Sequence, residues 1–292
     1  MRDLLRSSPW ILRAEEAAPP ETYEGKVRLY SIRYQSDECE VEGYAAFPAA
    51  GEGPWPGLVF NRGGNREFGA LKPDILCRYA CRGFAVFGSQ YRGNCGGTGK
   101  EEFGGSDVND VIRLVDIALG LACVRPEGIY MVGHSRGGMM TYLACARDSR
   151  IRAAAICAGL ADAFIMYDRF HDGEFDMRED CRELIGGAPY EMPEAYAARS
   201  AVCWADRIIP PVLILQGTDD WRVIPGQAYE MDRALAAAGK EHKLIIYPGA
   251  DHSLKGTSFI EDIVSWFAGY PLRAPQRERF NNRFPRKILP GF

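Results

Sequence analysis

Short apolar segments alternate with amphipathic segments along most of this chain. From Gly57 onward, continuous apolar runs of strand length recur, and such runs are typical of strands buried on both faces of a sheet. They cover residues 57–61, 84–89, 128–132, 152–158, 211–216 and 243–248. Segments of helical period separate them, at 71–82, 106–122, 137–147, 226–239 and 256–268. This alternation predicts an α/β fold with a mostly parallel sheet and helices on both faces.

A predicted antiparallel hairpin precedes the first of these runs. Residues 27–34 and 40–48 alternate apolar and polar side chains on either side of a polar turn, which is the period-two pattern of half-buried strands. With this hairpin, the expected sheet has eight strands. Residues 1–24 are interpreted as an amphipathic N-terminal leader that contains Pro19-Pro20 near its end.

The alternation of strand and helix lapses once along the chain. Between residues 159 and 207 the sequence is acidic and aromatic and is too long for a plain connection, so we expect a short cap inserted into one α/β domain spanning 25–270. The C-terminal tail, 271–292, carries six Arg or Lys residues against one Glu. This basic tail predicts either a solvated or docked terminus, or a contact with an acidic partner or a second subunit of a homo-oligomer.

Composition narrows the expected partners and compartment. The formal net charge of -4 leaves no global field that would gather nucleic acid or an anionic membrane surface, so neither is an expected partner. The nine cysteines are scattered without the paired spacing of a metal site, which is typical of free thiols in a reducing compartment. Residues 1–20 lack the uninterrupted apolar stretch of a secretory signal, and we expect a cytoplasmic protein.

The change of period at residues 128–147 contains the most informative motif. There, Gly133-His134-Ser135-Arg136-Gly137 joins an apolar strand to a segment of helical period. A serine at the tip of a tight strand–turn–helix, between glycines where a Cβ would clash, is typical of the nucleophile elbow of acyl-transfer enzymes. Because G-x-S-x-G alone is common, the flanking strand and helix carry this interpretation.

A nucleophilic serine needs a base, and the base needs a carboxylate to orient it. Of the four histidines, His252 follows the last predicted strand, at the sheet edge where ligands bind in parallel sheets. The carboxylate is expected just after the preceding strand, where Asp219 and Asp220 are adjacent, and Asp251 beside the histidine is a third possibility. The residues therefore predict a Ser-Asp-His triad whose acid is open among three aspartates.

With these residues in place, the chain resembles the catalytic domain of the prolyl oligopeptidase family of α/β-hydrolases over residues 25–270. The resemblance rests on GHSRGG around Ser135 and on segments elsewhere, namely SQYRGNCGGTG at 89–99, ELIGGAPYEMPEAYAARS at 183–200, and 217–225. The last segment resembles a Gly-x-x-Asp-x-x-Val motif followed by proline, and the acid of that motif is Asp220. The resemblance thus implies Ser135, Asp220 and His252 as catalytic residues, in the chain order of α/β-hydrolases.

The resemblance also implies where an oxyanion would bind. The family places His-Gly-Gly or Tyr-Gly-Gly after the third strand, whereas this chain has Arg62-Gly63-Gly64 there and so lacks the tyrosine donor. The implied donors are the backbone N–H of Arg136 and a group in the Arg62/Gly63 region. The Arg62 guanidinium is either a further donor or a solvent-facing side chain.

No cofactor or metal is expected. The glycine-rich segment after residue 92 does not match G-x-G-x-x-G, because Gly97-Thr98-Gly99 is followed by Lys100-Glu101-Glu102. No histidine pair or carboxylate cluster has the spacing of metal ligands.

These features predict a serine hydrolase that cleaves a peptide or ester bond of a small-molecule or short-peptide substrate through an acyl-enzyme intermediate. A carboxylesterase acting on small esters is the alternative, because family peptidases carry an N-terminal β-propeller that filters substrates and only the leader precedes the hydrolase sheet here. A catalytically silent binding protein of the same fold is a third possibility. The aromatic residues of the inserted region are expected either to line the pocket or to join the core; they are Tyr167, Phe170, Phe175 and Trp204.

Overall fold

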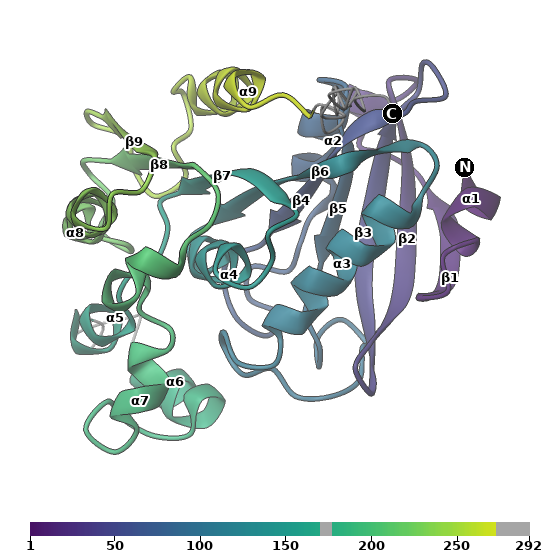
Figure 1. Ribbon diagram of the computed structural model, residues 1–292. Coiled ribbons are helices and arrows are strands. Elements are labelled where there is room, and N and C mark those ends of the chain that lie inside the picture. Colours follow the sequence, from purple (N-terminus) through teal and green to yellow (C-terminus); the bar gives the residue numbers. More distant parts are fainter. Residues whose placement is uncertain (170–176, 273–292) are drawn as a thin grey trace, which may run out of the picture.

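The continuous apolar runs of the sequence form the parallel strands of one sheet (Figure 1). The computed structural model describes residues 1–169 and 177–272, and within these ranges the sheet has nine strands in the order β1-β2-β3-β5-β4-β6-β7-β8-β9. The strands from β5 to the β9 edge pair in parallel, and the others pair antiparallel. The predicted mostly parallel α/β sheet is confirmed. The strands are β1 (Ile11–Ala17), β2 (Val27–Ser36), β3 (Cys39–Pro48), β4 (Trp55–Asn61), β5 (Ala85–Ser89), β6 (Val124–His134), β7 (Ile151–Cys157), β8 (Val212–Gly217) and β9 (His242–Tyr247).

Strand β1 is one strand more than the predicted eight. It lies in the segment interpreted as a leader, follows helix α1 (Arg2–Arg6), and pairs antiparallel with β2. A register shift between Ile11 and Arg13 interrupts the alternation, so that the buried residues of β1 are Ile11 and Ala14, three positions apart. A bulge of this kind removes the period-two signal by which a strand is recognised in a sequence, and the expected count is corrected to nine in the described ranges.

Side-chain alternation along the strands divides the core between the two faces of the sheet. In β4, Leu58 and Phe60 pack in a cluster with helices α2 (Pro73–Ala80) and α9 (Phe259–Gly269), whereas Val59 packs on the opposite face. The opposite face is covered by helices α3 (Val108–Gly120), α4 (Arg136–Cys145) and α8 (Pro225–Ala237).

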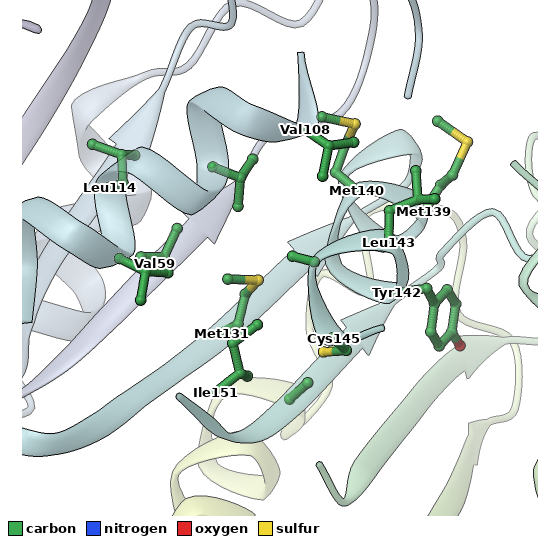
Figure 2. Close-up of a cluster of buried hydrophobic side chains, with 14 of the residues drawn as sticks. Val59, Val108, Leu114, Met131, Met139, Met140, Tyr142, Leu143, Cys145 and Ile151 are labelled. Carbon is green, nitrogen blue, oxygen red and sulfur yellow. The ribbon is translucent and has the colours of Figure 1, made fainter. Parts of the chain in front are cut away.

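Figure 2 shows the part of this core around α4, where Met139 and Leu143 lie in the same buried cluster as Met131 of β6 and Leu114 of α3. Burial of this apolar surface holds β6 and α4 in a fixed relation, and the turn between them carries Ser135. Among the helices of the described ranges, none combines the length and apolar character needed to cross a bilayer.

The inserted region leaves the sheet after β7 and forms helices away from it (Figure 1). These are α5 (Ala163–Arg169), α6 (Arg178–Ile185) and α7 (Pro193–Ala197). Tyr167 and Trp204 of this region are buried in the main hydrophobic core. Phe170, His171 and Phe175 lie outside the described residues, as does the tail from residue 273.

Candidate active site

Ser135 occupies the tight turn between β6 and α4, at the carboxyl edge of the parallel strands. Its backbone has φ 58° and ψ -125°, a strained conformation for a residue with a side chain, which a protein maintains only where surrounding contacts enforce it. Two glycines provide that surrounding. A Cβ at Gly133 would lie 2.0 Å from the Gly137 oxygen, and a Cβ at Gly137 would lie 2.0 Å from the Asn61 oxygen. The turn therefore accepts only glycine at both positions.

The structure brings Asp220 and His252 together from the loops that follow β8 and β9. The imidazole Nδ1 of His252 lies 3.0 Å and 2.9 Å from the two carboxylate oxygens of Asp220, whose side chain is fully buried. Because an ionised carboxylate only accepts hydrogen bonds, Nδ1 carries a proton and Nε2 keeps its lone pair when the ring is neutral. This is the orientation that a general base needs.

Ser135 and His252 line the same cavity. No hydrogen bond joins the Ser135 Oγ to the His252 ring among the contacts of residues 1–169 and 177–272. Such bonds are often long in ligand-free enzymes and tighten when substrate binds. The three predicted residues thus meet at one edge of the sheet, with the acid and the imidazole already bonded.

The two other candidate aspartates have local roles. The carboxylate of exposed Asp219 accepts a hydrogen bond from the Thr218 hydroxyl, at 2.9 Å. That of exposed Asp251 accepts from the backbone N–H and hydroxyl of Ser253. Short polar side chains commonly stabilise turns in this way. Of the three aspartates, Asp220 alone bonds to His252 in the described structure.

A buried glutamine orients the acid and was not singled out by the sequence. The side-chain amide of Gln216, at the end of β8, donates to Asp220 Oδ2 at 3.0 Å. The backbone N–H groups of Arg222 and Val223 each donate to Asp220 Oδ1 at 2.9 Å. These three donors fix the orientation of the carboxylate that accepts from the imidazole. The sequence did contain a signal for this role, because Gln216 is a polar residue near the end of an otherwise apolar strand, VLILQG.

His134, which precedes the serine, holds the loop of the proposed base. Its Nε2 lies 2.8 Å from the backbone oxygen of His252, and because a carbonyl only accepts, this nitrogen is the donor. The two imidazole rings are 4.8 Å apart between centroids. Desolvation, and then the proximity of His252, lower the pKa of His134 to about 4. His134 is therefore neutral at physiological pH and donates through Nε2–H.

Arg62 is buried rather than solvent-facing, which corrects one of the two expectations for this side chain. Its guanidinium donates to the main-chain oxygens of Gly63, Arg66, Gly69 and Gln90. Since its N–H groups are engaged in this way, the side chain is not available as an oxyanion donor either. The predicted donor in this region is therefore a backbone group.

Gly63 brings backbone directly against the serine. A Cβ on this glycine would lie 2.9 Å from the Ser135 Cβ and 3.5 Å from its Oγ. Among the hydrogen bonds of the described residues, the Gly63 N–H has no acceptor. The N–H of Arg136, in the first turn of α4, has no acceptor within its helix either, because the first four N–H groups of a helix lack one.

The side chain of Arg136 is buried and turns toward carboxylates beneath the turn. It forms an ion pair with Glu101 and a second with Asp107, at 2.6 Å. A nitrogen of the same guanidinium donates to the Gly64 oxygen at 3.0 Å. Arg136 thus contributes its backbone to the cavity edge while its side chain ties α4 to the loop after β4.

A cavity of about 770 Å³ opens over Ser135 and His252. Its walls are mainly apolar, and the inserted region contributes Leu160, Met166, Met177 and Asp180. Arg66, on the loop after β4, forms ion pairs with Asp180 and Glu183 of α6, which join that loop to the inserted region. Tyr167 and Trp204, expected at the pocket or in the core, belong to the core. The other apolar residues of the lining are Phe68, Phe103 and Val223.

The described part of the chain offers no cluster of three or more histidine, cysteine, aspartate or glutamate side chains that could hold a metal ion. The reacting groups that this edge of the sheet can provide are a hydroxyl, an imidazole paired with a carboxylate, and backbone N–H groups. That set is suited to acyl transfer.

Comparisons with known proteins identify the family and the fold. The model of the prolyl oligopeptidase family matches residues 75–270. The uncharacterized peptidase YtmA of Bacillus subtilis (strain 168) is 31% identical over 227 residues, which cover 77% of this chain and 86% of that protein.

Two solved structures share the fold. An acylaminoacyl peptidase of Pyrococcus horikoshii aligns with a TM-score of 0.72 and 22% identity, over 86% of this chain and 43% of that one. An acetyl xylan esterase of Paenibacillus sp. R4 aligns with a TM-score of 0.68 and 20% identity, over 92% of both chains. The predicted α/β-hydrolase fold is confirmed. The chain spans less than half the length of the peptidase structure, and identities this low establish the fold alone.

The neutral state of His134 makes stability depend on pH in a defined direction. The native pKa of about 4 lies below the ordinary value of 6.5, so between these values the unfolded chain binds a proton that the native chain excludes. The contribution of His134 to the free energy of unfolding therefore falls as pH decreases from about 6.5 to 4, by about 3 kcal/mol in total. His134→Gln keeps an N–H donor and removes the titration.

Urea unfolding at pH 7 and pH 4.5 measures this effect. We expect His134→Gln to gain stability relative to the wild type as pH falls. His242→Gln controls for the loss of an imidazole elsewhere, because His242 begins β9 and the loop that carries His252 follows the other end of that strand. A stability difference between His134→Gln and wild type that does not change with pH would contradict the assignment of a neutral His134.

Proposed function

Because this chain belongs to the prolyl oligopeptidase family, we propose that it is a serine hydrolase with Ser135, His252 and Asp220 as its catalytic triad. The observation that carries the proposal is the bonded Asp220–His252 pair, whose imidazole opens on the same cavity as Ser135. The strained backbone of Ser135 supports it, because such strain is maintained at nucleophile elbows.

The proposed reaction has two acyl-transfer steps. The Ser135 Oγ attacks the substrate carbonyl carbon while Nε2 of His252 accepts the hydroxyl proton, and Asp220 stabilises the resulting imidazolium. The backbone N–H groups of Arg136 and Gly63 donate to the oxyanion of the tetrahedral intermediate. His252 then protonates the leaving group, and a water molecule, activated by the same imidazole, releases the acyl group from Ser135.

The cavity supports a small-molecule or short-peptide substrate. Its volume of about 770 Å³ is within the range of pockets that enclose ligands of that size, and its apolar walls favour an apolar acyl or side-chain group next to Ser135. All nine cysteines are free thiols, which supports a reducing compartment such as the cytoplasm.

Peptide and ester bonds are both within the reach of this chemistry. The relation to YtmA, a protein named as a peptidase and matched over 86% of its length, favours a peptidase of short substrates. A carboxylesterase is the second candidate, favoured by the alignment of the acetyl xylan esterase with the whole domain, over 92% of both chains.

Replacing the proposed nucleophile is the direct test of the hydrolase proposal. We expect Ser135→Ala to lose labelling by a fluorophosphonate probe and to lower kcat/KM on a p-nitrophenyl ester by at least about 10⁴-fold. Ser253→Ala, which removes an exposed hydroxyl beside the proposed base, is the matched control and should retain labelling and turnover. A wild-type protein with neither labelling nor turnover on a broad ester panel would favour the silent binding protein instead.

The adjacent aspartates provide a paired test of the acid. We expect Asp220→Asn to lower kcat by about 10⁴-fold, because the amide favours the wrong tautomer of His252. Asp219→Asn should stay within about twofold of wild type, because its carboxylate contacts only the neighbouring turn. Equal losses of steady-state turnover in both variants would contradict the assignment of Asp220.

The choice between peptidase and esterase is tested by a matched pair of substrates. The same N-acyl amino acid is presented once as a p-nitroanilide and once as a p-nitrophenyl ester. For a peptidase, we expect Ser135-dependent hydrolysis of both substrates. Cleavage of the anilide requires His252 to protonate a poor amine leaving group, and a site that can do this also cleaves the more reactive ester. Hydrolysis of the ester with no detectable anilide cleavage would instead establish the esterase alternative.

A further inference from the structure

We propose that Tyr91 and Arg62 are positioning residues that orient the Gly63 N–H toward the oxyanion. This inference rests on the proposed function, because it concerns the second donor of the same site. Neither side chain is a catalytic residue in this proposal. Each donates to a peptide oxygen of the loop after β4, Tyr91 to that of Arg62 and Arg62 to that of Gly63.

The Tyr91 hydroxyl fixes the peptide group that carries the Gly63 N–H. It donates to the backbone oxygen of Arg62 at 3.0 Å, and the tyrosine is fully buried. In a trans peptide the C=O and the following N–H point in opposite directions. Anchoring the Arg62 oxygen on Tyr91 therefore turns the Gly63 N–H away from Tyr91. A Cβ on Gly63 would lie only 2.9 Å from the Ser135 Cβ, so this glycine packs directly against the serine, and we infer that its N–H faces the reacting centre.

The Arg62 guanidinium fixes the next peptide groups of the loop from within. It donates to the oxygens of Gly63 at 3.1 Å, of Arg66 at 2.9 Å and of Gly69 at 3.5 Å, so that the loop closes around it. Its Nη2 and Nε donate to the Gln90 oxygen at 2.8 Å and 3.1 Å, which joins the loop to the end of β5. The planar guanidinium has five N–H donors and here reaches four carbonyl oxygens at once, whereas an ammonium group has only three donors.

This guanidinium is a buried cation that main-chain dipoles compensate. Among the ion pairs of the described ranges, none includes Arg62. Burial lowers the pKa of Arg62, yet an arginine of this kind stays charged at neutral pH. A buried charge is costly unless its hydrogen bonds are satisfied. The loop carbonyls are thus held toward Arg62 by a strong charge–dipole attraction, and their partner N–H groups point outward.

Tyr91 also connects the two sides of the proposed oxyanion hole. Its ring lies 5.0 Å from the Arg62 guanidinium carbon and 4.9 Å from that of Arg136, the residue whose backbone N–H is the other proposed donor. Tyr91 has φ 63°, a conformation that a bulky residue adopts only under constraint. Burial raises the pKa of its hydroxyl, which therefore keeps the proton that it donates. The residues that supply or position both donors thus pack on one rigid ring.

Tyr91→Phe tests the proposal, because it deletes one hydroxyl and keeps the ring between the two guanidinium groups. We expect kcat on a p-nitrophenyl ester to fall about 10-fold, a fraction of the loss seen when an oxyanion donor is removed outright, with KM within about twofold. The affinity for a trifluoromethyl ketone, which forms a tetrahedral adduct on the serine, should fall by a similar factor. A merely structural role would not weaken the tetrahedral adduct while sparing KM.

Tyr130→Phe is the matched control. Tyr130 is buried, and its hydroxyl donates to the Tyr270 oxygen at 2.9 Å and to the Phe267 oxygen at 3.3 Å, at the end of α9. The control should keep kcat within about twofold of wild type, although both variants lose a tyrosine hydroxyl that donates to backbone oxygens. If Tyr91→Phe matches Tyr130→Phe in kcat and in ketone affinity, the positioning role of Tyr91 is overturned.

Arg62→Lys tests the second positioning residue, since it keeps the charge and loses the fork. We expect a larger fall in kcat, about 10²-fold, because several peptide groups are released together. Wild-type kcat in this variant would overturn the role of Arg62, and if the variant does not fold, Tyr91→Phe decides the proposal.

The outcomes separate this inference from the proposed function. If the wild type shows Ser135-dependent turnover and Tyr91→Phe has the same kcat and ketone affinity as the wild type, only this inference is refuted. A wild type with no Ser135-dependent turnover refutes the proposed function as well.

Discussion

The close contact between the turn after β6 and the end of β4 is the constraint on which the site depends. Gly137 approaches the Asn61 oxygen so closely that a Cβ would lie 2.0 Å from it, and Gly63 meets the side chain of Ser135. Parallel pairing of β4 with β6 places these two segments at one edge of the sheet. Without side chains between them, the backbone of one strand end reaches the hydroxyl on the other. The geometry of the proposed nucleophile and of its oxyanion donors therefore has a common origin.

Buried charge surrounds this contact and is compensated at each point. Arg136 is balanced by Glu101 and Asp107, whereas Arg62 is balanced by main-chain oxygens. Buried ion pairs of this kind add little net stability, because desolvation offsets much of the attraction. Their structural effect is directional, since each fixes a peptide group or a helix end. A site that must stabilise developing charge benefits from dipoles that are already oriented before the reaction begins.

The inserted region completes the cavity without contributing a residue to the proposed triad. It supplies apolar wall residues such as Leu160, Met166 and Met177, and α6 is tied to the loop after β4 through Arg66. The acylaminoacyl peptidase structure is longer than this chain, which spans 43% of it. The two share the fold. In this chain the inserted region shapes the cavity while the strand ends hold the proposed reacting groups, so the cavity can vary with the inserted segment while those groups stay in place.

The sequence by itself determined the alternation of strands and helices, the elbow around Ser135, and the types of residue that the reaction needs. These are local properties: hydrophobic period, glycine at crowded turns and the position of a residue relative to the strand before it. The predicted ranges of the parallel strands agree with β4 to β9. The strand β1 was hidden because a bulge removes its alternation. The residue pattern also left three aspartates open, until resemblance to a family selected one.

The tertiary structure alone decided which groups meet across the chain. It brought the carboxylate of Asp220 to His252, placed Gln216 behind that carboxylate, and enclosed Arg62 in a ring of carbonyl oxygens. It also placed Tyr91 against the loop after β4, although the two are separate in sequence. Such contacts join residues from different loops, and neither period nor propensity at one position carries information on which partner packs there. They follow only when the sheet has set the distances between its strand ends.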